Sequence, residues 1–293
     1  MNERKASRLR RCARCLSIAA CLAGVIACTA WLAGEQASAQ YSRRLADSLG
    51  DLYAVGTDAE TPASTEAPVP IADAPLPRET PLPIQEDFRA LYSANRHLVG
   101  WLEAGESIDL PVVQFDNEFY LTHDFYGRDS ADGTLFVNEA NQIWPPDDVI
   151  IIHGHNMRSG AQFGTLRRFE SYRYARRHPL VTFRTIRDRE DVRYVVVAAF
   201  NASMFEGNPE YFDIARLRFH DGPAEAGKRE MEAYLAAIDN LSLWHGPVKA
   251  NADDRLLMLV TCSYYQDDGR FVLVCRRLRK GETPEAVEAL FAG

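Results

Sequence analysis

Eight short apolar runs between residues 98 and 278 constrain the fold of this sequence more than any other feature. Each run has the length and the β-branched and aromatic content of a strand. The runs are Leu98–Leu102, Ile108–Phe115, Thr134–Val137, Val149–His153, Leu180–Ile186, Val192–Asn201, Arg255–Thr261 and Arg270–Leu278. Few helical segments separate them, so the pattern predicts a closed or nearly closed eight-stranded β-barrel.

Helical patterns flank and interrupt the runs. A short amphipathic helix is predicted near residues 88–92, and further helices at Ala161–Phe169 and Pro223–Asn240. The second of these lies in the long connection before the seventh run. A C-terminal helix is predicted after Thr283, which suits an N-cap and is followed by Pro284. The predicted fold class is therefore mostly β, with an N-terminal helix, a helix in the long loop and a C-terminal helix.

The first 34 residues read as a membrane-targeting segment. Residues 1–15 are strongly basic, and Leu16–Gly34 is free of charge over 19 residues. A helix of that length crosses a hydrocarbon core of about 30 Å. Positive charge before the span predicts a single-pass plasma-membrane protein with its N-terminus in the cytoplasm and the rest outside. The alternative is a cleaved signal peptide, because Ala37-Ser38-Ala39 resembles a cleavage site.

Residues 35–85 separate this segment from the rest of the chain. They are expected to form a membrane-proximal segment and a proline-rich linker, because seven prolines lie between Thr57 and Gln85 among alanine, threonine and acidic residues. Such a composition buries too little apolar surface to form a core. The folded domain is therefore predicted at residues 86–293.

Charge and cysteine content exclude several classes of protein. A net charge of −8 argues against a general nucleic-acid binder, which needs a basic face. No metal motif is present. Four of the six cysteines lie in the first 28 residues, where Cys12 and Cys15 read as membrane-proximal thiols. Only Cys262 and Cys275 lie in the predicted domain, so that domain is not a disulfide framework.

The hairpin predicted from Leu256 to Leu278 carries a candidate reactive pair. Cys262 ends its first strand and Arg270 begins its second. A thiol and a guanidinium at adjacent strand ends can form a thiolate and stabilise an oxyanion. Cys275 has the opposite strand parity to Arg270, so we expect it in the core. A Cys262–Cys275 disulfide is disfavoured because the two would not lie opposite each other.

The pair needs a base, and His155 is the best candidate among seven histidines. It follows a buried-strand pattern that stops at Gly154, in a loop at the strand end. His153 is the alternative, because it would share a face with His155 if the strand continued.

The residues around these three positions resemble the sortase family. The segment Ile152-His153-Gly154-His155-Asn156-Met157, followed by Phe163-Gly164 and Leu166, is similar to the histidine segment of class B sortases. Leu259-Val260-Thr261-Cys262 resembles the cysteine signature, and Arg270 lies eight residues beyond it. Similar segments precede them at Val99–Leu102, Leu110–Gln114 and Tyr120–His123. Met258 and His153 depart from the usual pattern, but neither is a catalytic position.

The resemblance implies a cysteine transpeptidase with a sortase-type barrel and no cofactor. Cys262 would be the nucleophile, His155 the general acid and base, and Arg270 the oxyanion or substrate-positioning group. Partners would be secreted proteins with a C-terminal sorting motif, cleaved through a thioacyl-enzyme, and an amine acceptor in peptidoglycan. The alternatives are a pilin-polymerising sortase that uses a protein lysine, and a catalytically inactive barrel that binds peptide.

Substrate-binding residues are less clearly marked. The expected set comprises Asn141, Thr261, Ser263, Tyr264, Leu241 and Trp244. The resemblance suggests Leu241 and Trp244, because the long loop forms one wall of the substrate groove in class B sortases. Ser263 could supply a backbone N–H to the oxyanion, and Tyr264 could line the groove or merely cover the end of the barrel.

Overall fold

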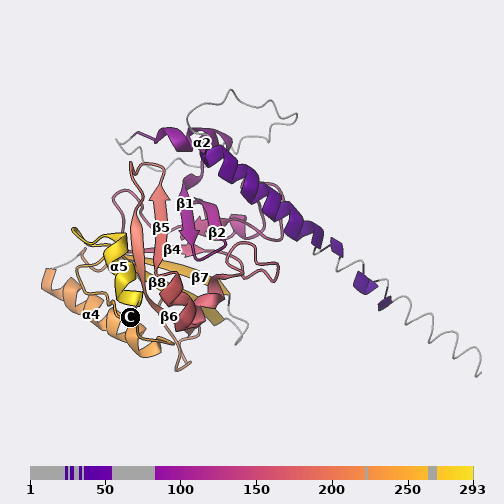
Figure 1. Cartoon of the computed structure of the whole chain (residues 1–293). Coiled ribbons are helices and arrows are strands. Elements are labelled where there is room, and N and C mark those ends of the chain that lie inside the picture. Colours follow the sequence, from indigo (N-terminus) through magenta and orange to yellow (C-terminus); the bar gives the residue numbers. More distant parts are fainter. Residues whose placement is uncertain are drawn as a thin grey trace, which may run out of the picture.

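The chain folds into a closed β-barrel. The computed structural model describes residues 24–25, 27–29, 33–34, 36–54, 83–221, 224–262 and 269–292. Its strands follow the order β1-β2-β3-β4-β7-β8-β6-β5 around the barrel (Figure 1). They are β1 (Leu98–Ala104), β2 (Ile108–Val113), β3 (Leu135–Val137), β4 (Val149–His153), β5 (Leu180–Thr185), β6 (Arg193–Ser203), β7 (Leu256–Cys262) and β8 (Gly269–Arg277). The predicted eight-stranded barrel is confirmed, and each predicted run overlaps one strand.

Strand alternation divides the apolar residues of the barrel between two sides. β2–β3 and β4–β7 pair in parallel, and the other neighbours are antiparallel. The barrel core includes Ile150, Ile152, Leu257, Leu259, Phe271, Leu273 and Cys275. The outer cluster includes Val149, Ile151, Met258, Val260, Val272 and Val274 of the same strands, together with Met231, Tyr234 and Ile238 of α4 (Ala224–Leu241). Because β4, β7 and β8 are apolar on both faces, they read as continuous hydrophobic runs.

The remaining helices are short. They are η1 (Glu86–Phe88), α2 (Arg89–Ala94), η2 (Phe119–Leu121), η3 (Leu166–Glu170), α3 (Tyr172–Arg177) and α5 (Pro284–Ala292). The N-terminal, long-loop and C-terminal helices of the domain are confirmed. Thr283 caps α5 as predicted, because its Oγ1 accepts a hydrogen bond of 3.2 Å from the N–H of Ala286.

The predicted helix at Ala161–Phe169 is wrong. Residues 161–165 form a turn-rich loop, and within the predicted range only residues from Leu166 onward are helical, in the 3-10 helix η3. Gly160 has a φ of 83°, and a Cβ on Gly164 would lie 2.1 Å from the carbonyl oxygen of Met157. These two glycines allow tight turns that a regular helix does not contain.

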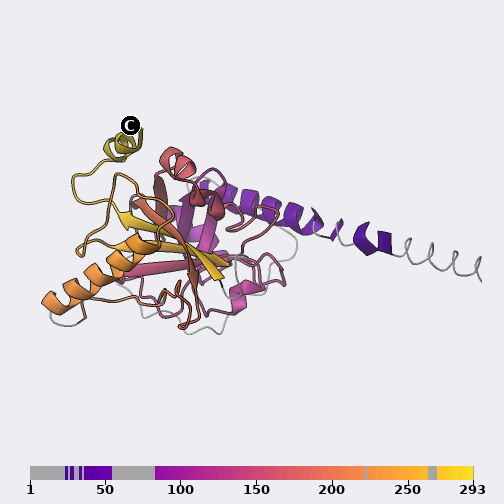
Figure 2. The same cartoon turned by 90° about the horizontal axis from the view of Figure 1, so that it is seen from below.

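An N-terminal helix at residues 36–54 packs against the barrel. Its Leu49 is buried, and the ring of Tyr53 stacks on Trp101 of β1 with centroids 4.7 Å apart. The helix lies on the other side of the barrel from α4 (Figure 2).

The predicted localisation is corrected by the structure. Most of the expected span at Leu16–Gly34 lies outside the described residues. Among the residues that are described, no helix is both long enough and apolar enough to cross a membrane. The helix at 36–54 carries charges such as Arg43 and Asp47 and uses its apolar side to contact the barrel. The prediction of a single-pass membrane protein is therefore not supported.

A buried ion pair attaches the C-terminal segment to the barrel. The side chain of Arg276 in β8 is 3% exposed and donates two hydrogen bonds to Glu282, at 2.6 and 2.8 Å. This contact lowers the pKa of Glu282 to about 2, assisted by the N–H of Arg279. Val287 and Phe291 of α5 then join the barrel core.

We predict that Glu282→Gln lowers the free energy of unfolding by about 3 kcal/mol at neutral pH, because it leaves the Arg276 charge buried without a partner. A carboxylate with a lowered pKa stabilises the fold above its unfolded-state pKa and loses that effect as the pH falls. The difference between wild type and variant should therefore shrink from about pH 5 to about pH 2. Urea unfolding at several pH values measures it, with the exposed Glu288→Gln as control. A pH-independent difference would contradict the account.

Candidate active site

Three polar side chains share the outer face at one end of the sheet. Cys262 is the last residue of β7 and pairs directly with Arg270 of β8. His153 is the last residue of β4 and pairs with Val260 of β7. All three follow the parity of the outer cluster, since Ile151, Val260 and Val272 are two residues away on their strands. The thiol, the guanidinium and this imidazole therefore point out of the barrel on the same side.

The His155 loop is fastened to the end of β7. The N–H of Gly154 donates to the carbonyl of Val260 at 3.1 Å, and Thr261 Oγ1 donates back to the carbonyl of Gly154 at 2.7 Å. Two residues after Gly154, Asn156 Nδ2 donates to the carbonyl of Cys262 at 3.0 Å. Both neighbours of His155 are thus bound to the last two residues of β7. These bonds bring His155 beside Cys262 although 107 residues separate the two in sequence.

The hydrogen bonding of His155 identifies which ring nitrogen can exchange a proton. Its Nε2 lies 2.7 Å from the carbonyl oxygen of Leu121. A carbonyl only accepts hydrogen bonds, so Nε2 carries the proton. In the neutral ring Nδ1 is then the basic nitrogen. The half-buried ring is oriented by a backbone group, which is the usual requirement for a general base.

His153 has a different environment from His155. Burial and the nearby positive charge of Arg270 lower the pKa of His153 to about 4. Its Nε2 lies 3.3 Å from Nδ2 of Asn138, and its ring is tilted against Phe136. A histidine that stays neutral near pH 7 is a weak base, so His153 is poorly suited to proton transfer.

The two cysteines of the barrel also differ. Cys262 is exposed, whereas Cys275 is fully buried in the barrel core, and burial raises the pKa of the Cys275 thiol. The register places Cys275 opposite Leu257 and not Cys262, and both thiols are free. The placement of Cys275 in the core is confirmed. Only Cys262 combines exposure with a neighbouring cation.

The expected substrate-binding residues fall in different places. Thr261 is buried and bonded to Gly154. Asn141 is buried, and its side chain bonds Asp147 and the backbone of Val149 and Ile151. The structure thus gives Asn141 an internal role, not a position facing a ligand.

The other four predicted substrate-binding residues belong to the long loop before β7 and to the segment between β7 and β8. Trp244 is buried in the barrel core and donates to the carbonyl of Phe169 at 2.8 Å. Leu241 is half-buried against the outer cluster. Ser263 and Tyr264 lie outside the described residues. Of the four that the structure describes, only Thr261 is seen to bond the His155 loop.

Three further residues around the site were not expected from the sequence. Asn156 binds the backbone of Cys262, Asn138 contacts His153, and Gly133 packs against His155. Asn156 belongs to the segment around His155 that resembles the sortase histidine segment, and this resemblance could have marked it as a site residue. Within the described ranges, no group of three or more histidine, cysteine or acidic residues could hold a metal ion.

Comparisons with known proteins find sortase B proteins among those similar to this chain. No family model matches the chain. Sortase B of Listeria monocytogenes is 26% identical over 194 residues, which cover 65% of this chain and 73% of the relative. Sortase B of Staphylococcus aureus is 22% identical over 200 residues, covering 67% and 76%.

Solved structures give the same result for the fold. The X-ray structure of Clostridium perfringens sortase B has a TM-score of 0.55 and 26% identity, and covers 65% of this chain and 99% of that one. A Staphylococcus aureus sortase B–substrate complex has a TM-score of 0.58 at 21% identity, covering 67% and 86%. The resemblance to class B sortases is therefore confirmed in sequence and in fold.

We predict that Thr261→Val weakens the attachment of the His155 loop. The substitution keeps the side-chain shape but leaves the Gly154 carbonyl without its 2.7 Å hydrogen bond, at a cost of about 1–3 kcal/mol in the free energy of unfolding. Urea unfolding measures this cost, and Thr182→Val in β5 is the matched control. Equal stability of the two variants would show that the hydroxyl does not hold the loop.

Proposed function

We propose that this chain, a relative of the class B sortases, is a cysteine transpeptidase that forms a thioacyl-enzyme on Cys262. The observation that carries the proposal is the direct pairing of Cys262 with Arg270, next to a His155 loop that is hydrogen-bonded to Cys262 itself. Nucleophile, cation and proton carrier are the three groups that this chemistry requires.

The first half-reaction cleaves the acyl donor. The Cys262 thiolate attacks the scissile carbonyl carbon, and the carbonyl oxygen takes the negative charge beside Arg270. When the tetrahedral intermediate collapses, the C–N bond breaks and the leaving amine takes the proton that the His155 imidazolium holds on Nδ1. Nε2 stays bonded to Leu121 throughout, so the ring keeps its orientation.

The second half-reaction transfers the acyl group. An acceptor amine attacks the thioester carbonyl and gives its proton to Nδ1 of His155, and Cys262 leaves as thiolate. The products are a new amide and the starting enzyme with a protonated His155, so the proton balance closes over the two steps. All groups involved belong to this chain or to its two substrates.

Arg270 is suited to the oxyanion role by its geometry. The residue is half-buried, and Nη1 donates to the backbone carbonyl of Gly269 at 3.0 Å. This bond holds the guanidinium at the start of β8, and within the described ranges its other N–H groups make no further hydrogen bond. A permanently charged group with several fixed donors stabilises developing negative charge without reorganisation.

We further propose that the acyl donor is the C-terminal sorting motif of secreted proteins and the acceptor an amine of peptidoglycan. A structurally similar Staphylococcus aureus protein has been solved as a sortase B–substrate complex, which supports a substrate-binding role for this barrel. Isolation of the transfer product identifies the acceptor. An amide to a protein lysine in place of a peptidoglycan amine would indicate pilin polymerisation.

We predict that Cys262→Ala abolishes both cleavage and transfer. A library of peptides scanned for cleavage by the wild-type chain provides the substrate, and mass spectrometry detects the acyl-enzyme. Cys275→Val is the matched control and should retain activity, since that thiol is buried in the core. An active Cys262→Ala variant would refute the assignment of the nucleophile.

We predict that Arg270→Lys lowers kcat by about 10²–10³-fold, because an ammonium replaces the fork of donors at the oxyanion. Steady-state kinetics on the best peptide of the library measures the loss. Arg277→Lys, at the exposed end of the same strand, should leave kcat unchanged. A full-rate Arg270→Lys variant would mean that charge alone is sufficient there.

A further inference from the structure

One residue near His155 has an unfavourable backbone conformation. Gln162 has a φ of 49° and is the only non-glycine residue with positive φ among those the structure describes. Left-handed backbone is costly for a side chain such as glutamine. Residues held in this way persist only where surrounding contacts enforce the conformation, and such residues concentrate at functional sites.

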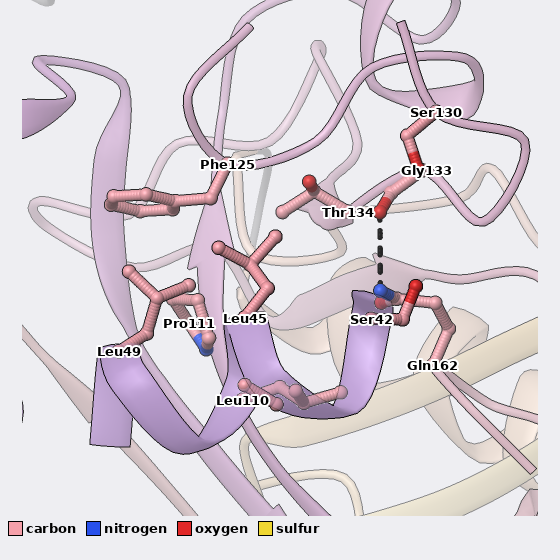
Figure 3. Close-up of a pocket in the computed structure, with 11 residues that line it drawn as sticks. Ser42, Leu45, Leu49, Leu110, Pro111, Phe125, Ser130, Gly133, Thr134 and Gln162 are labelled. Atoms are coloured by element: carbon pink, nitrogen blue, oxygen red, sulfur yellow. Dashed lines mark hydrogen bonds between the residues drawn. The ribbon is translucent and has the colours of Figure 1, made fainter. Parts of the chain in front are cut away.

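The side chain of Gln162 carries a second cost. Its Nε2 donates to the carbonyl of Gly133 at 3.1 Å, while its Oε1 is buried and has no hydrogen-bond partner among the described residues (Figure 3). Buried polar atoms normally have partners. Gln162 therefore has both a left-handed backbone and an unpaired buried oxygen. The one side-chain hydrogen bond it makes to the described residues in this conformation is the bond to Gly133.

Gly133 links this bond to His155. It has a φ of 62°, and a Cβ at this position would lie 2.4 Å from the carbonyl oxygen of Tyr120, 3.0 Å from that of Leu121 and 3.2 Å from Cδ2 of His155. Gly133 is thus packed against the imidazole and against the carbonyl that accepts the Nε2 proton. A shift of Gly133 would move the carbonyl of Leu121 away from the ring.

The backbone around Gln162 is also attached to the backbone of the His155 loop. Gln162 forms a β-bridge with Asn156, and the N–H of the following Phe163 donates to the carbonyl of His155 at 2.9 Å. The backbone of Gln162 is therefore fixed to the His155 loop, and its side chain to the segment that contains Leu121 and Gly133. Gln162 thus joins the His155 loop to the segment that contains Leu121 and Gly133. The separation of these two segments sets the distance between His155 Nε2 and the Leu121 carbonyl.

The N-terminal helix supports this arrangement from outside. Ser42 Oγ donates to Asp132, the neighbour of Gly133, and Tyr41 donates to Asp124 Oδ2 at 2.5 Å. Figure 3 shows Ser42 beside Gln162 in the small cavity between this helix and the barrel. The segment that receives the Gln162 bond is therefore held on both sides.

We propose that Gln162 is a positioning residue for His155: through Gly133 it holds the Leu121 carbonyl against Nε2, which fixes the tautomer and leaves Nδ1 for proton transfer. The tautomer follows from the geometry alone, and its catalytic consequence rests on the proposed transpeptidase function. Gln162 does not contact the reacting atoms.

The test measures the tautomer of His155 directly. Nitrogen NMR of the full-length chain labelled with ¹⁵N-histidine, at about pH 8.5 where an ordinary imidazole is neutral, should show His155 as the Nε2–H form. A His155→Gln variant assigns the signal. In Gln162→Leu the signal should move to a mixture of tautomers. Gln142→Leu, which removes a similar bond to the carbonyl of Trp144 at 3.3 Å far from His155, should leave it unchanged.

A second variant separates positioning from folding. Gln162→Gly removes the bond to Gly133 but suits the left-handed backbone, so it should fold even if Gln162→Leu does not. It should give the same mixed tautomer and lower kcat for the best library peptide by roughly tenfold, with KM within about twofold.

The outcomes are distinct. An unchanged Nε2–H signal in Gln162→Gly would overturn the positioning role, whatever happens to activity. A changed signal, with no peptide cleaved even by the wild-type chain, would support the positioning of the ring and refute the transpeptidase. A changed signal with an unchanged kcat would overturn the catalytic consequence of the tautomer.

Discussion

The parallel pairing of β4 with β7 is the interaction on which the site depends. It joins two strands that are more than a hundred residues apart, in a register that runs from Val149 opposite Leu256 to His153 opposite Val260. Both strands are buried on both faces, so a one-residue slip would exchange the barrel core with the outer cluster. The two sets of side chains differ in size and shape, so close packing fixes the register. Because the register is fixed, the loop that follows β4 lies beside the end of β7. The hydrogen bonds from Thr261 to Gly154 and from Asn156 to Cys262 hold the loop there.

The barrel and its loops carry two cysteines and two histidines that the sequence alone makes hard to tell apart. Their surroundings give the two members of each pair different properties. Cys262 is exposed beside Arg270, whereas Cys275 lies in the core on the other face of the hairpin. His155 lies in a loop with Nε2 bonded to a carbonyl, whereas His153 is kept neutral by burial and by Arg270. Strand parity thus separates Cys262 from Cys275, and the two residues of chain beyond the end of β4 separate His155 from His153.

Sequence reasoning identified the parts of the molecule that periodicity determines. The strand runs, the parity of Cys275 and the N-cap at Thr283 all follow from local patterns and are present in the structure. The helix at Ala161–Phe169 was wrong because apolar spacing outweighed the turn-forming glycines Gly160 and Gly164. The membrane span was inferred from composition alone, and among the described residues no helix is long and apolar enough to support it.

Other features had no readable signal. Asn141 and Trp244 were plausible groove residues, but their burial depends on tertiary contacts that no short pattern encodes. The positive φ of Gln162 could not be predicted from the sequence either, because glutamine has no preference for that conformation. The proximity of Leu121, Gly133 and His155 likewise depends on the packing of three loops. The sequence therefore marks candidate reactive residues more clearly than the residues that surround them.

The central claim is that His155 acts on Cys262, and alkylation of Cys262 by iodoacetamide as a function of pH tests it most directly. Peptide mapping by mass spectrometry reads the modification of Cys262 separately from the N-terminal cysteines and requires no substrate. Near neutral pH the wild-type chain should react about tenfold or more faster than His155→Gln, because the imidazole takes up the proton that the thiol releases. Superimposable profiles would contradict the account, because they would show that the imidazole has no effect on the thiol.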